Sequence, residues 1–332
     1  MAKPDATSCE AEPLVRCDGL VVRFVGREGT IHAVNGVSFT LDAGEALCIL
    51  GESGSGKSVT LRAMMRLLPV HTARISGTVS VAGRNVMGLD LRALSDLRGA
   101  EVGMIFQEPM TAFDPVFTIG TQIIESLKRH EGLSEHRARH RALEMLEMVQ
   151  IPSPARRLDN YPYEMSGGMR QRAMIALALA CKPRLLLADE PTTALDATVQ
   201  IQILQLLRRL QRELRMAVLF VTHDIGVAVE ISDRIAVMYA GRFVETGPVR
   251  TIIHEPRHPY TRGLLASTVH GALRGRRLEA IPGSPPNLAA LPPGCAFAPR
   301  CRHVEPCCTT AVPPEVWHSG TRMVRCTVAT RR

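Results

Sequence analysis

Short apolar runs separated by polar turns fill the N-terminal part of the chain and recur further along it. The segments at 20–24 and 37–41 alternate with turns rich in glycine and aspartate, which is typical of an antiparallel sheet. Apolar runs without the alternating polar residues are typical of strands that are buried on both faces. These runs stand at 46–50, 101–107, 185–188 and 217–221. The pattern predicts an antiparallel sheet and, beside it, a mixed sheet with buried strands.

Helical periodicity replaces the strand pattern between about residues 115 and 165. Arginine, histidine and glutamate crowd one face of 137–146, and the simplest interpretation of that charge run is a solvated helix face. A second strong helical stretch follows at 170–180. The sequence therefore predicts a helical subdomain at about 110–168, within a larger unit that spans 14–250.

The chain from roughly Thr251 onward is rich in proline. Nine prolines stand between Pro282 and Pro314, and proline neither continues a helix nor donates to a sheet. We expect residues 251–332 to form an irregular extension that something other than a periodic core holds together. The predicted fold is α/β, with a mixed sheet, an antiparallel β subdomain, a helical subdomain and this cysteine-rich extension.

A glycine-rich loop joins the apolar run 46–50 to a helix-forming stretch at 59–65. In such a loop the glycines let backbone N–H groups wrap a polyphosphate, Lys57 neutralises the β- and γ-phosphates, and the Ser58 hydroxyl can ligate Mg²⁺. The residues that match the pattern G-x-x-x-x-G-K-[ST] are Gly51, Glu52, Ser53, Gly54, Ser55, Gly56, Lys57 and Ser58. An ordinary glycine-rich turn explains neither the Lys-Ser pair nor the flanking strand and helix, so the sequence predicts a site for ATP and Mg²⁺.

Two adjacent carboxylates, Asp189 and Glu190, follow the buried run at 185–188. Charges at the exit of an apolar strand are costly unless they face a metal or a reacting group. The arrangement fits an aspartate that coordinates Mg²⁺, which leaves Glu190 to orient and polarise a water.

Three further features have two interpretations each when taken alone. Phe24 can stack on a nucleotide base or belong to the core. Ser166, Gly167 and Gly168 precede a strong helix, where they form either an anion site or a plain N-cap. His223, after the apolar run at 217–221, is more often a structural histidine than a catalytic one.

The order of these features resembles the nucleotide-binding subunits of ABC transporters. The features are the phosphate loop, Gln107, Ser166-Gly167-Gly168, Asp189-Glu190, Ala194-Leu195-Asp196 and His223. Within that superfamily, three segments resemble the ATPase subunits of dipeptide/oligopeptide importers. They are Gln107-Glu108-Pro109-Met110-Thr111, Pro256-Arg257-His258-Pro259-Tyr260-Thr261 and Ile281-Pro282-Gly283. The resemblance runs from about residue 14 to 328.

The resemblance implies a role for each matching residue. It implies that Glu190 is the general base, that His223 contacts the γ-phosphate, and that Gln107 senses it. With Ser58 and Asp189, Gln107 would also hold Mg²⁺. Asp196 would belong to the loop that crosses a dimer seam. The signature residues Ser166, Gly167 and Gly168 would act in trans, on ATP held by the phosphate loop of a second subunit.

The same resemblance implies partners and a place in the cell. The partners are a second ATPase subunit, with a heterodimer favoured, two transmembrane permease subunits, and a substrate-binding protein reached through the complex. The chain would lie peripherally on the cytoplasmic face of the inner membrane. The cargo would be a dipeptide or oligopeptide, while nickel, glutathione or sugar importers share much of this branch.

Charge and hydropathy leave other classes open at first. A net charge of +8 is compatible with nucleic acid, an anionic membrane or only a solvated surface. DNA-repair ABC ATPases need long coiled coils before the Asp-Glu strand, whereas here about 130 residues without sustained heptads precede it. Translation-factor types carry two cassettes, so we expect no nucleic-acid partner.

No apolar run approaches a membrane span and the N-terminus lacks a signal-peptide core, which predicts a cytosolic chain.

Five of the nine cysteines fall in the last 38 residues. In a reducing cytosol such a cluster favours a metal or iron–sulfur site over disulfides. Five residues separate Cys295 from Cys301, six separate Cys301 from Cys308, and seventeen separate Cys308 from Cys326. This spacing resembles the tail of the peptide importers, in which a [4Fe–4S] cluster is implied. Four thiolates also suit Zn²⁺, and free thiols are the third alternative. Cys307 is the spare, because Cys308 preserves the spacing.

Overall fold

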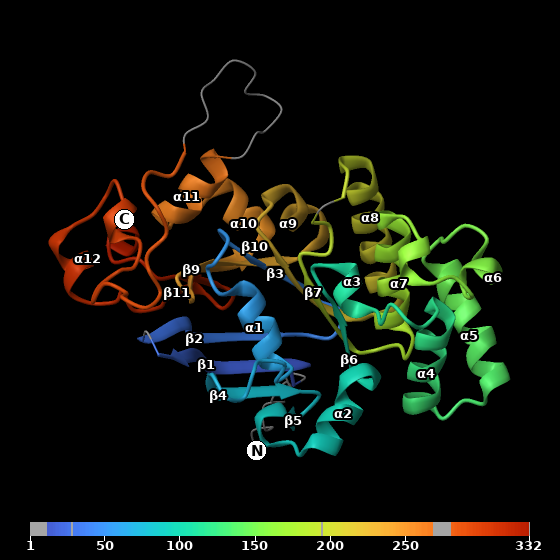
Figure 1. Ribbon diagram of the computed structural model, residues 1–332. Coiled ribbons are helices and arrows are strands. Elements are labelled where there is room, and N and C mark those ends of the chain that lie inside the picture. Colours follow the sequence, from blue (N-terminus) through green and yellow to red (C-terminus); the bar gives the residue numbers. More distant parts are fainter. Residues whose placement is uncertain (1–11, 28, 194, 268–279, 332) are drawn as a thin grey trace, which may run out of the picture.

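The computed structural model describes residues 12–27, 29–193, 195–267 and 280–331 (Figure 1). Its N-terminal part forms an antiparallel sheet with the strand order β2-β1-β4-β5. The strands are β1 (Val15–Gly26), β2 (Gly29–Leu41), β4 (Ala73–Val81) and β5 (Arg84–Asn85). Leu20 and Val22 of β1 are buried while Arg23 is exposed, as expected of a sheet with one solvated face. The predicted antiparallel sheet is confirmed.

The second sheet runs through the centre of the molecule in the order β11-β12-β10-β9-β3-β8-β7-β6. Its strands are β3 (Ala46–Leu50), β6 (Val102–Ile105), β7 (Leu185–Asp189), β8 (Ala217–Thr222), β9 (Arg234–Tyr239), β10 (Arg242–Pro248), β11 (Val316–Ser319) and β12 (Arg322–Val324). From β9 to β6 all neighbours are parallel, and beyond β9 they are antiparallel. The mixed sheet is confirmed. Parallel strands end at one edge, so the loops after β3, β6, β7 and β8 meet there.

Two apolar cores lie on opposite faces of the central sheet. Leu47 and Ile49 of β3 contribute to the core shared with the antiparallel sheet, whereas Cys48 and Leu50 contribute to the core shared with the helices. This alternation explains why the whole of β3 is apolar. Helix α1 (Lys57–Met64), which follows the glycine-rich loop, packs into the first core through Leu61 and Met64.

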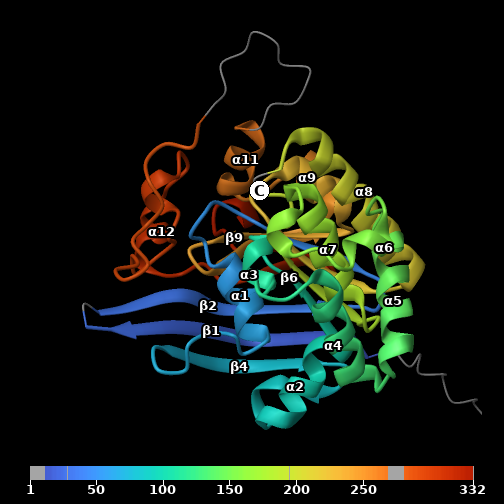
Figure 2. The same ribbon diagram turned by 45° about the vertical axis from the view of Figure 1, so that its right-hand side comes forward.

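Helices α4 to α6 form a group at one end of the molecule (Figures 1 and 2). On α5, Ala138 and Met145 are buried while Arg137 and Arg139 are exposed, which confirms the solvated helix face and the helical subdomain. The helices before β9 are α2 (Leu91–Ala100), α3 (Pro109–Ala112), α4 (Ile119–Glu131), α5 (Glu135–Met148), α6 (Pro154–Arg157), α7 (Gly167–Leu179), α8 (Ala197–Leu214) and α9 (Ile225–Ile231).

The C-terminal extension starts near the middle of the molecule and reaches the end opposite α4 to α6 (Figures 1 and 2). Its helices are α10 (Val249–His254), α11 (Pro259–Ala266) and α12 (Pro306–Thr310). Short 3₁₀ turns stand at Val86–Gly88, Pro162–Glu164, Ala298–Arg300 and Ala329–Arg331. In the described part of the chain, no helix is long and apolar enough to cross a membrane.

The expectation that the extension packs without a periodic core is wrong for part of it. Strand β12 pairs antiparallel with β10, and β11 pairs with β12, so the extension adds two strands to the central sheet. Tyr260, Phe297 and Met323 are buried against the two cores. The stretch at 316–324 contains no proline and can therefore supply backbone donors to the open edge of β10. The proline-rich residues 280–297 carry neither helix nor strand, as predicted.

Candidate functional site

A cavity of about 850 Å³ opens at the edge where the parallel strands end. The glycine-rich loop after β3 forms one wall through Glu52, Ser53, Gly54, Gly56, Lys57 and Ser58. Side chains from three other strand ends complete it: Gln107 after β6, Glu190 after β7 and His223 after β8. The fold thus brings together residues that are far apart in the sequence.

Two glycines of the loop hold positions that no side chain could occupy. A Cβ atom on Gly51 would lie 2.3 Å from the carbonyl oxygen of Met238. One on Gly56 would lie 2.3 Å from that of Ala33, and Gly56 also has a φ of +106°. The loop is therefore pressed against β9 and β2, at a distance that only glycine permits.

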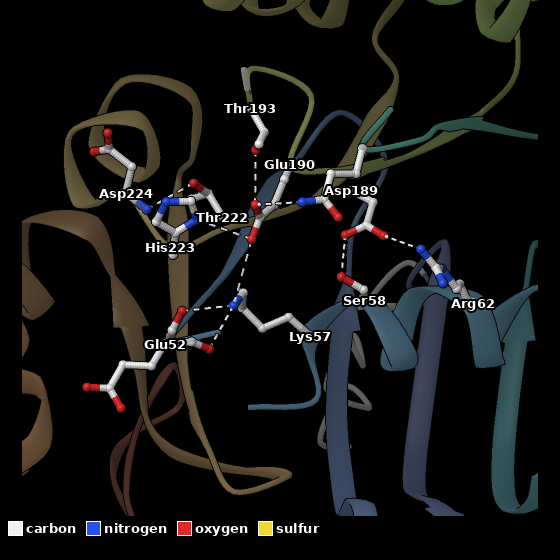
Figure 3. A network of polar contacts seen from close by, with 12 residues as sticks. Glu52, Lys57, Ser58, Arg62, Asp189, Glu190, Thr193, Thr222, His223 and Asp224 are labelled. Atoms are coloured by element: carbon white, nitrogen blue, oxygen red, sulfur yellow. Dashed lines mark hydrogen bonds and ion pairs between the residues drawn. The ribbon is translucent and has the colours of Figure 1, made fainter. Parts of the chain in front are cut away.

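Lys57, the first residue of α1, is buried, with 4% of its side chain exposed. Its ammonium group donates hydrogen bonds to the carbonyl oxygens of Gly51, at 2.8 Å, and Glu52, at 3.0 Å (Figure 3). It also lies 4.0 Å from Oε1 of Glu190. Burial lowers the pKa of Lys57, and the carboxylates of Glu190 and Asp189 oppose that shift.

Asp189, the last residue of β7, is fully buried. The Ser58 hydroxyl donates to its Oδ1 at 2.6 Å, and Arg62 lies 3.6 Å from its Oδ2. Burial raises the pKa of Asp189, while the Ser58 hydrogen bond opposes that rise. Oδ2 is buried and makes no hydrogen bond within the described chain. An oxygen pair of this kind fits Mg²⁺, a hard cation that prefers oxygen ligands.

The Glu190 carboxylate is the meeting point of the site (Figure 3). It accepts a hydrogen bond from the Thr193 hydroxyl at 3.0 Å and one from the Gln107 amide at 3.4 Å. The His223 Nδ1 atom lies 3.2 Å from its Oε1. The backbone of Glu190 is in the left-handed region, with a φ of 45°, and its N–H donates a hydrogen bond to the carbonyl of Val221. Such a conformation is uncommon and costly for a residue other than glycine.

Seven residues predicted for the nucleotide site do not line this cavity. Gly51, Ser55 and Asp189 adjoin the residues that line it, whereas the other four stand at the starts of α7 and α8. Ser166 is exposed and caps α7 by accepting from the N–H of Met169. Gly167 and Gly168 open that same helix. Asp196 is exposed and caps α8 through its Oδ1. Its neighbour Ala194, which belongs to the same predicted loop, lies outside the described residues.

Phe24 lines the cavity together with Ile31 of β2. The Phe24 ring also packs against the core beneath the antiparallel sheet, so both interpretations drawn from the sequence describe its position. Thr193, Leu264 and Leu288 line the cavity as well, and sequence reasoning missed them. Thr193 could have been found from its place in the turn three residues after Glu190. No local pattern marks the two leucines, because they reach the cavity from the extension.

The four predicted cysteine ligands come together in the extension. Cys295, Cys301, Cys308 and Cys326 all line one small cavity, and Cys307 does not line it. Burial raises the pKa of Cys295 to about 11, and the other three thiols add to the shift. No described cysteine is in a disulfide. As the side chains stand, the described residues contain no group of three or more His, Cys, Asp or Glu positioned to hold a metal ion.

Two family models match the chain. The model described as "ABC transporter" matches residues 34–193, and the one described as "Oligopeptide/dipeptide transporter, C-terminal region" matches residues 244–308. A putative peptide import ATP-binding protein of Brucella melitensis is 49% identical, over 95% of this chain and 97% of its own. The dipeptide transport ATP-binding protein of Bacillus subtilis is 45% identical, over 97% of this chain and 96% of its own. The oligopeptide transport ATP-binding protein of Salmonella typhimurium is 47% identical, over 93% of this chain and 92% of its own.

Solved structures agree on the fold of the larger unit. A dimeric ATP-binding cassette in a post-hydrolysis state, bound to ADP and Pi, is 33% identical with a TM-score of 0.64, and the match covers 71% of this chain and 99% of that one. A cassette from Clostridium perfringens, part of a transporter complex, is 25% identical with a TM-score of 0.62, over 74% and 92%. The chain belongs to the ABC transporter family, among the ATP-binding subunits of its oligopeptide/dipeptide branch.

Proposed function

We propose that this chain is the energy-coupling ATPase subunit of a peptide importer. The observation that carries the proposal is the single cavity in which the glycine-rich loop meets the Glu190 carboxylate. The peptide cargo rests on the names of relatives that match nearly the whole chain. The ATPase unit spans residues 14–250, with its helical subdomain at about 110–168, and the extension spans 251–332.

ATP binds with its phosphates in the loop. Backbone N–H groups of the loop other than those of Glu52 and Ser55, which donate to the Tyr260 hydroxyl and the Glu52 carbonyl, donate to the phosphate oxygens, and Lys57 neutralises part of their charge. The base lies against Phe24. Ser58, Asp189 and Gln107 hold Mg²⁺, which supplies further neutralisation of the phosphate charge when it is bound.

Hydrolysis requires a water to attack the γ-phosphorus while the bond to the bridging oxygen breaks. Glu190 orients this water and accepts its proton, for which its carboxylate must stay ionised. Lys57, at 4.0 Å, and His223, at 3.2 Å, flank that carboxylate in the described structure. His223 and Gln107 respond to the γ-phosphate from the ends of two other strands.

The residues that do not face the cavity of their own chain serve a second cassette. Ser166 stands exposed at the N-terminus of α7, where a hydroxyl and unpaired N–H groups suit a phosphate. With Gly167 and Gly168 it closes over ATP held by the partner cassette, and Asp196 lies at the seam. The partner cassette is a different chain, which makes the pair a heterodimer.

Coupling takes place on the cytoplasmic face of the inner membrane, where the two cassettes bind two permease subunits peripherally. A substrate-binding protein delivers the peptide from the other side. Gln107 and the segment after it link the γ-phosphate to the permease, and closure of the two cassettes around ATP moves the transmembrane subunits.

The assembled transporter should therefore hydrolyse ATP faster than the isolated chain. We expect reconstitution with a second cassette and both permeases to raise ATP turnover at least about tenfold, because each ATP needs groups from two cassettes. Peptide-loaded binding protein should raise it further. Phosphate release from proteoliposomes measures both steps. Full, peptide-stimulated turnover by the isolated chain, or stimulation by nickel, glutathione or sugar in place of peptide, would contradict the proposal.

The four cysteines of the extension hold a [4Fe–4S] cluster, with Zn²⁺ as the alternative. Their shared cavity supports the fit, since Cys308 of α12 lines it together with Cys295, Cys301 and Cys326 from irregular segments. Thiolates are the ligands of both groups. Such a site confines residues that bury little apolar surface of their own, as structural metals do in small domains.

Protein prepared without oxygen should therefore be brown, with broad absorption near ~400 nm and about four irons per chain. Cys308→Ser should remove the colour and make the extension more sensitive to protease. Cys307→Ser is the matched control and should do neither, because Cys307 does not line the shared cavity. Colourless protein with one tightly held zinc would establish the alternative.

A further inference from the structure

Arg300 of the extension binds the phosphate loop directly. Its guanidinium donates from Nη1 to Oε2 of Glu52 at 2.8 Å and from Nη2 to Oε1 at 3.1 Å. Only 5% of the Arg300 side chain is exposed, against 25% for Glu52. A two-pronged, largely buried pair of this kind fixes the orientation of the carboxylate as well as its distance.

Arg300 itself is held firmly before it reaches the loop. Its Nε donates to the carbonyl of Pro282 at 2.8 Å, and Nη1 also contacts the Tyr239 hydroxyl at 3.3 Å. The guanidinium lies 6.0 Å from the Phe297 ring centroid and 5.8 Å from that of Tyr239. The Arg300 guanidinium is thus fixed in position by the extension and by β9, which lowers the entropic cost of forming the ion pair with Glu52.

Glu52 is held on its backbone too. Its N–H donates to the hydroxyl of Tyr260, a fully buried residue of α11, at 2.9 Å. Its carbonyl accepts from Lys57 at 3.0 Å. Figure 3 shows the Glu52 carboxylate turned away from Lys57, while the Glu52 backbone faces it. The extension therefore holds the residue whose carbonyl positions the phosphate-binding lysine.

The extension also runs along the loop beyond this contact. The N–H of His32 on β2 donates to the carbonyl of Leu288 at 2.9 Å. Pro285 and Pro286 line a small cavity together with Gly54 of the phosphate loop. The segment before Arg300 is thus attached to the same wall of the nucleotide site, which makes a rigid path from the extension to the loop.

We propose that Arg300 is a positioning residue for ATP binding, which acts by holding the Glu52 carboxylate away from the phosphates. The proposal rests on ATP being the ligand of the loop. Without Arg300, an unpaired negative charge would stand in a loop that must accept a polyphosphate, and like charges at this range repel. The loop would also lose the contact that orients the Glu52 carbonyl toward Lys57.

The test is a double-mutant cycle on the full-length chain, with binding of trinitrophenyl-ATP as the readout. Arg300→Met should raise the Kd about tenfold to thirtyfold, because one ion pair between buried groups is lost and a charge is left unpaired. Glu52→Gln, which removes the repelling charge, should change the Kd by less than about threefold, and the double variant should recover most of the loss. Arg300→Lys should fall between wild type and Arg300→Met.

Arg325→Met is the matched control. Arg325 lies in the same extension, one residue before a cysteine of the shared cavity. It forms an ion pair with Glu315, and 13% of the Arg325 side chain is exposed. Within the described residues its other hydrogen bonds reach the carbonyls of Phe243 and Pro313, and none reaches the phosphate loop. We expect this variant to bind the nucleotide like wild type, even where thermal unfolding shows an equal loss of stability.

Kinetics of the assembled transporter supply a second readout. Arg300→Met should raise KM for ATP by a factor similar to the rise in Kd and leave kcat within about twofold, because it impairs binding and not the chemical step. Unchanged affinity in Arg300→Met, or a loss that Glu52→Gln does not recover, would overturn the proposal. Failure of the wild-type chain to bind any nucleotide would instead overturn the proposed function.

Discussion

Glu190→Gln is expected to keep ATP bound while ATP turnover falls about 10²–10⁴-fold, the usual contribution of a general base. The amide retains the shape of the carboxylate but cannot accept a proton from water. The hydrogen bond from Thr193 at 3.0 Å can persist, so the loop geometry should survive. Loss of the charge also removes a neighbour of Lys57 that lies 4.0 Å away, which leaves that ammonium fully available to the phosphates.

The assembled transporter is the right place to measure this effect. Single-turnover hydrolysis reports the chemical step, and size-exclusion chromatography with ATP reports whether the trapped nucleotide holds the cassettes together. Glu213→Gln is the control, because the Glu213 side chain is 59% exposed on α8 and does not line the cavity. Near-normal hydrolysis by the Glu190 variant would remove this residue from the role of base.

Lys57→Met should weaken ATP binding about tenfold to a hundredfold, because a hydrogen bond to a charged group contributes about 1.5–3 kcal/mol and each 1.4 kcal/mol is tenfold in affinity. The ammonium makes two hydrogen bonds to the loop carbonyls of Gly51 and Glu52. Removal of the ammonium therefore leaves both carbonyl oxygens without this hydrogen-bond donor. It also leaves the Glu190 carboxylate without its nearest cation from the loop.

Titration of the purified chain with trinitrophenyl-ATP gives the Kd of this variant. Lys128→Met is the matched control, since Lys128 pairs with Glu135 on the helical subdomain and is 48% exposed. Exposed ion pairs contribute at most about 1 kcal/mol to stability, so the control should fold and bind as wild type does. Wild-type affinity in the Lys57 variant would contradict the assignment of the loop as the phosphate site.

Local chemistry determined much of the site in advance. The glycines at 51, 54 and 56, together with Lys57 and Ser58, could be recognised because a strand, a loop and a helix adjoin in the sequence. Asp189 could be recognised because it ends an apolar run, and burial on both faces makes such a run conspicuous. The helical subdomain and the sheets were also predictable, since their periodicities are local.

What only the tertiary structure decided is which distant groups touch. Gln107 and His223 converge on Glu190 because parallel strands end at one edge of the sheet, and no short segment of the sequence determines the order of those strands. The same holds for Arg300, which is 248 residues from Glu52. Proline suggested a loosely packed extension, whereas the open edge of β10 and the buried ring of Tyr260 bind it to the core. Packing between segments that are remote in the sequence depends on the complementarity of their shapes and charges. The surfaces that must fit together exist only in the folded chain.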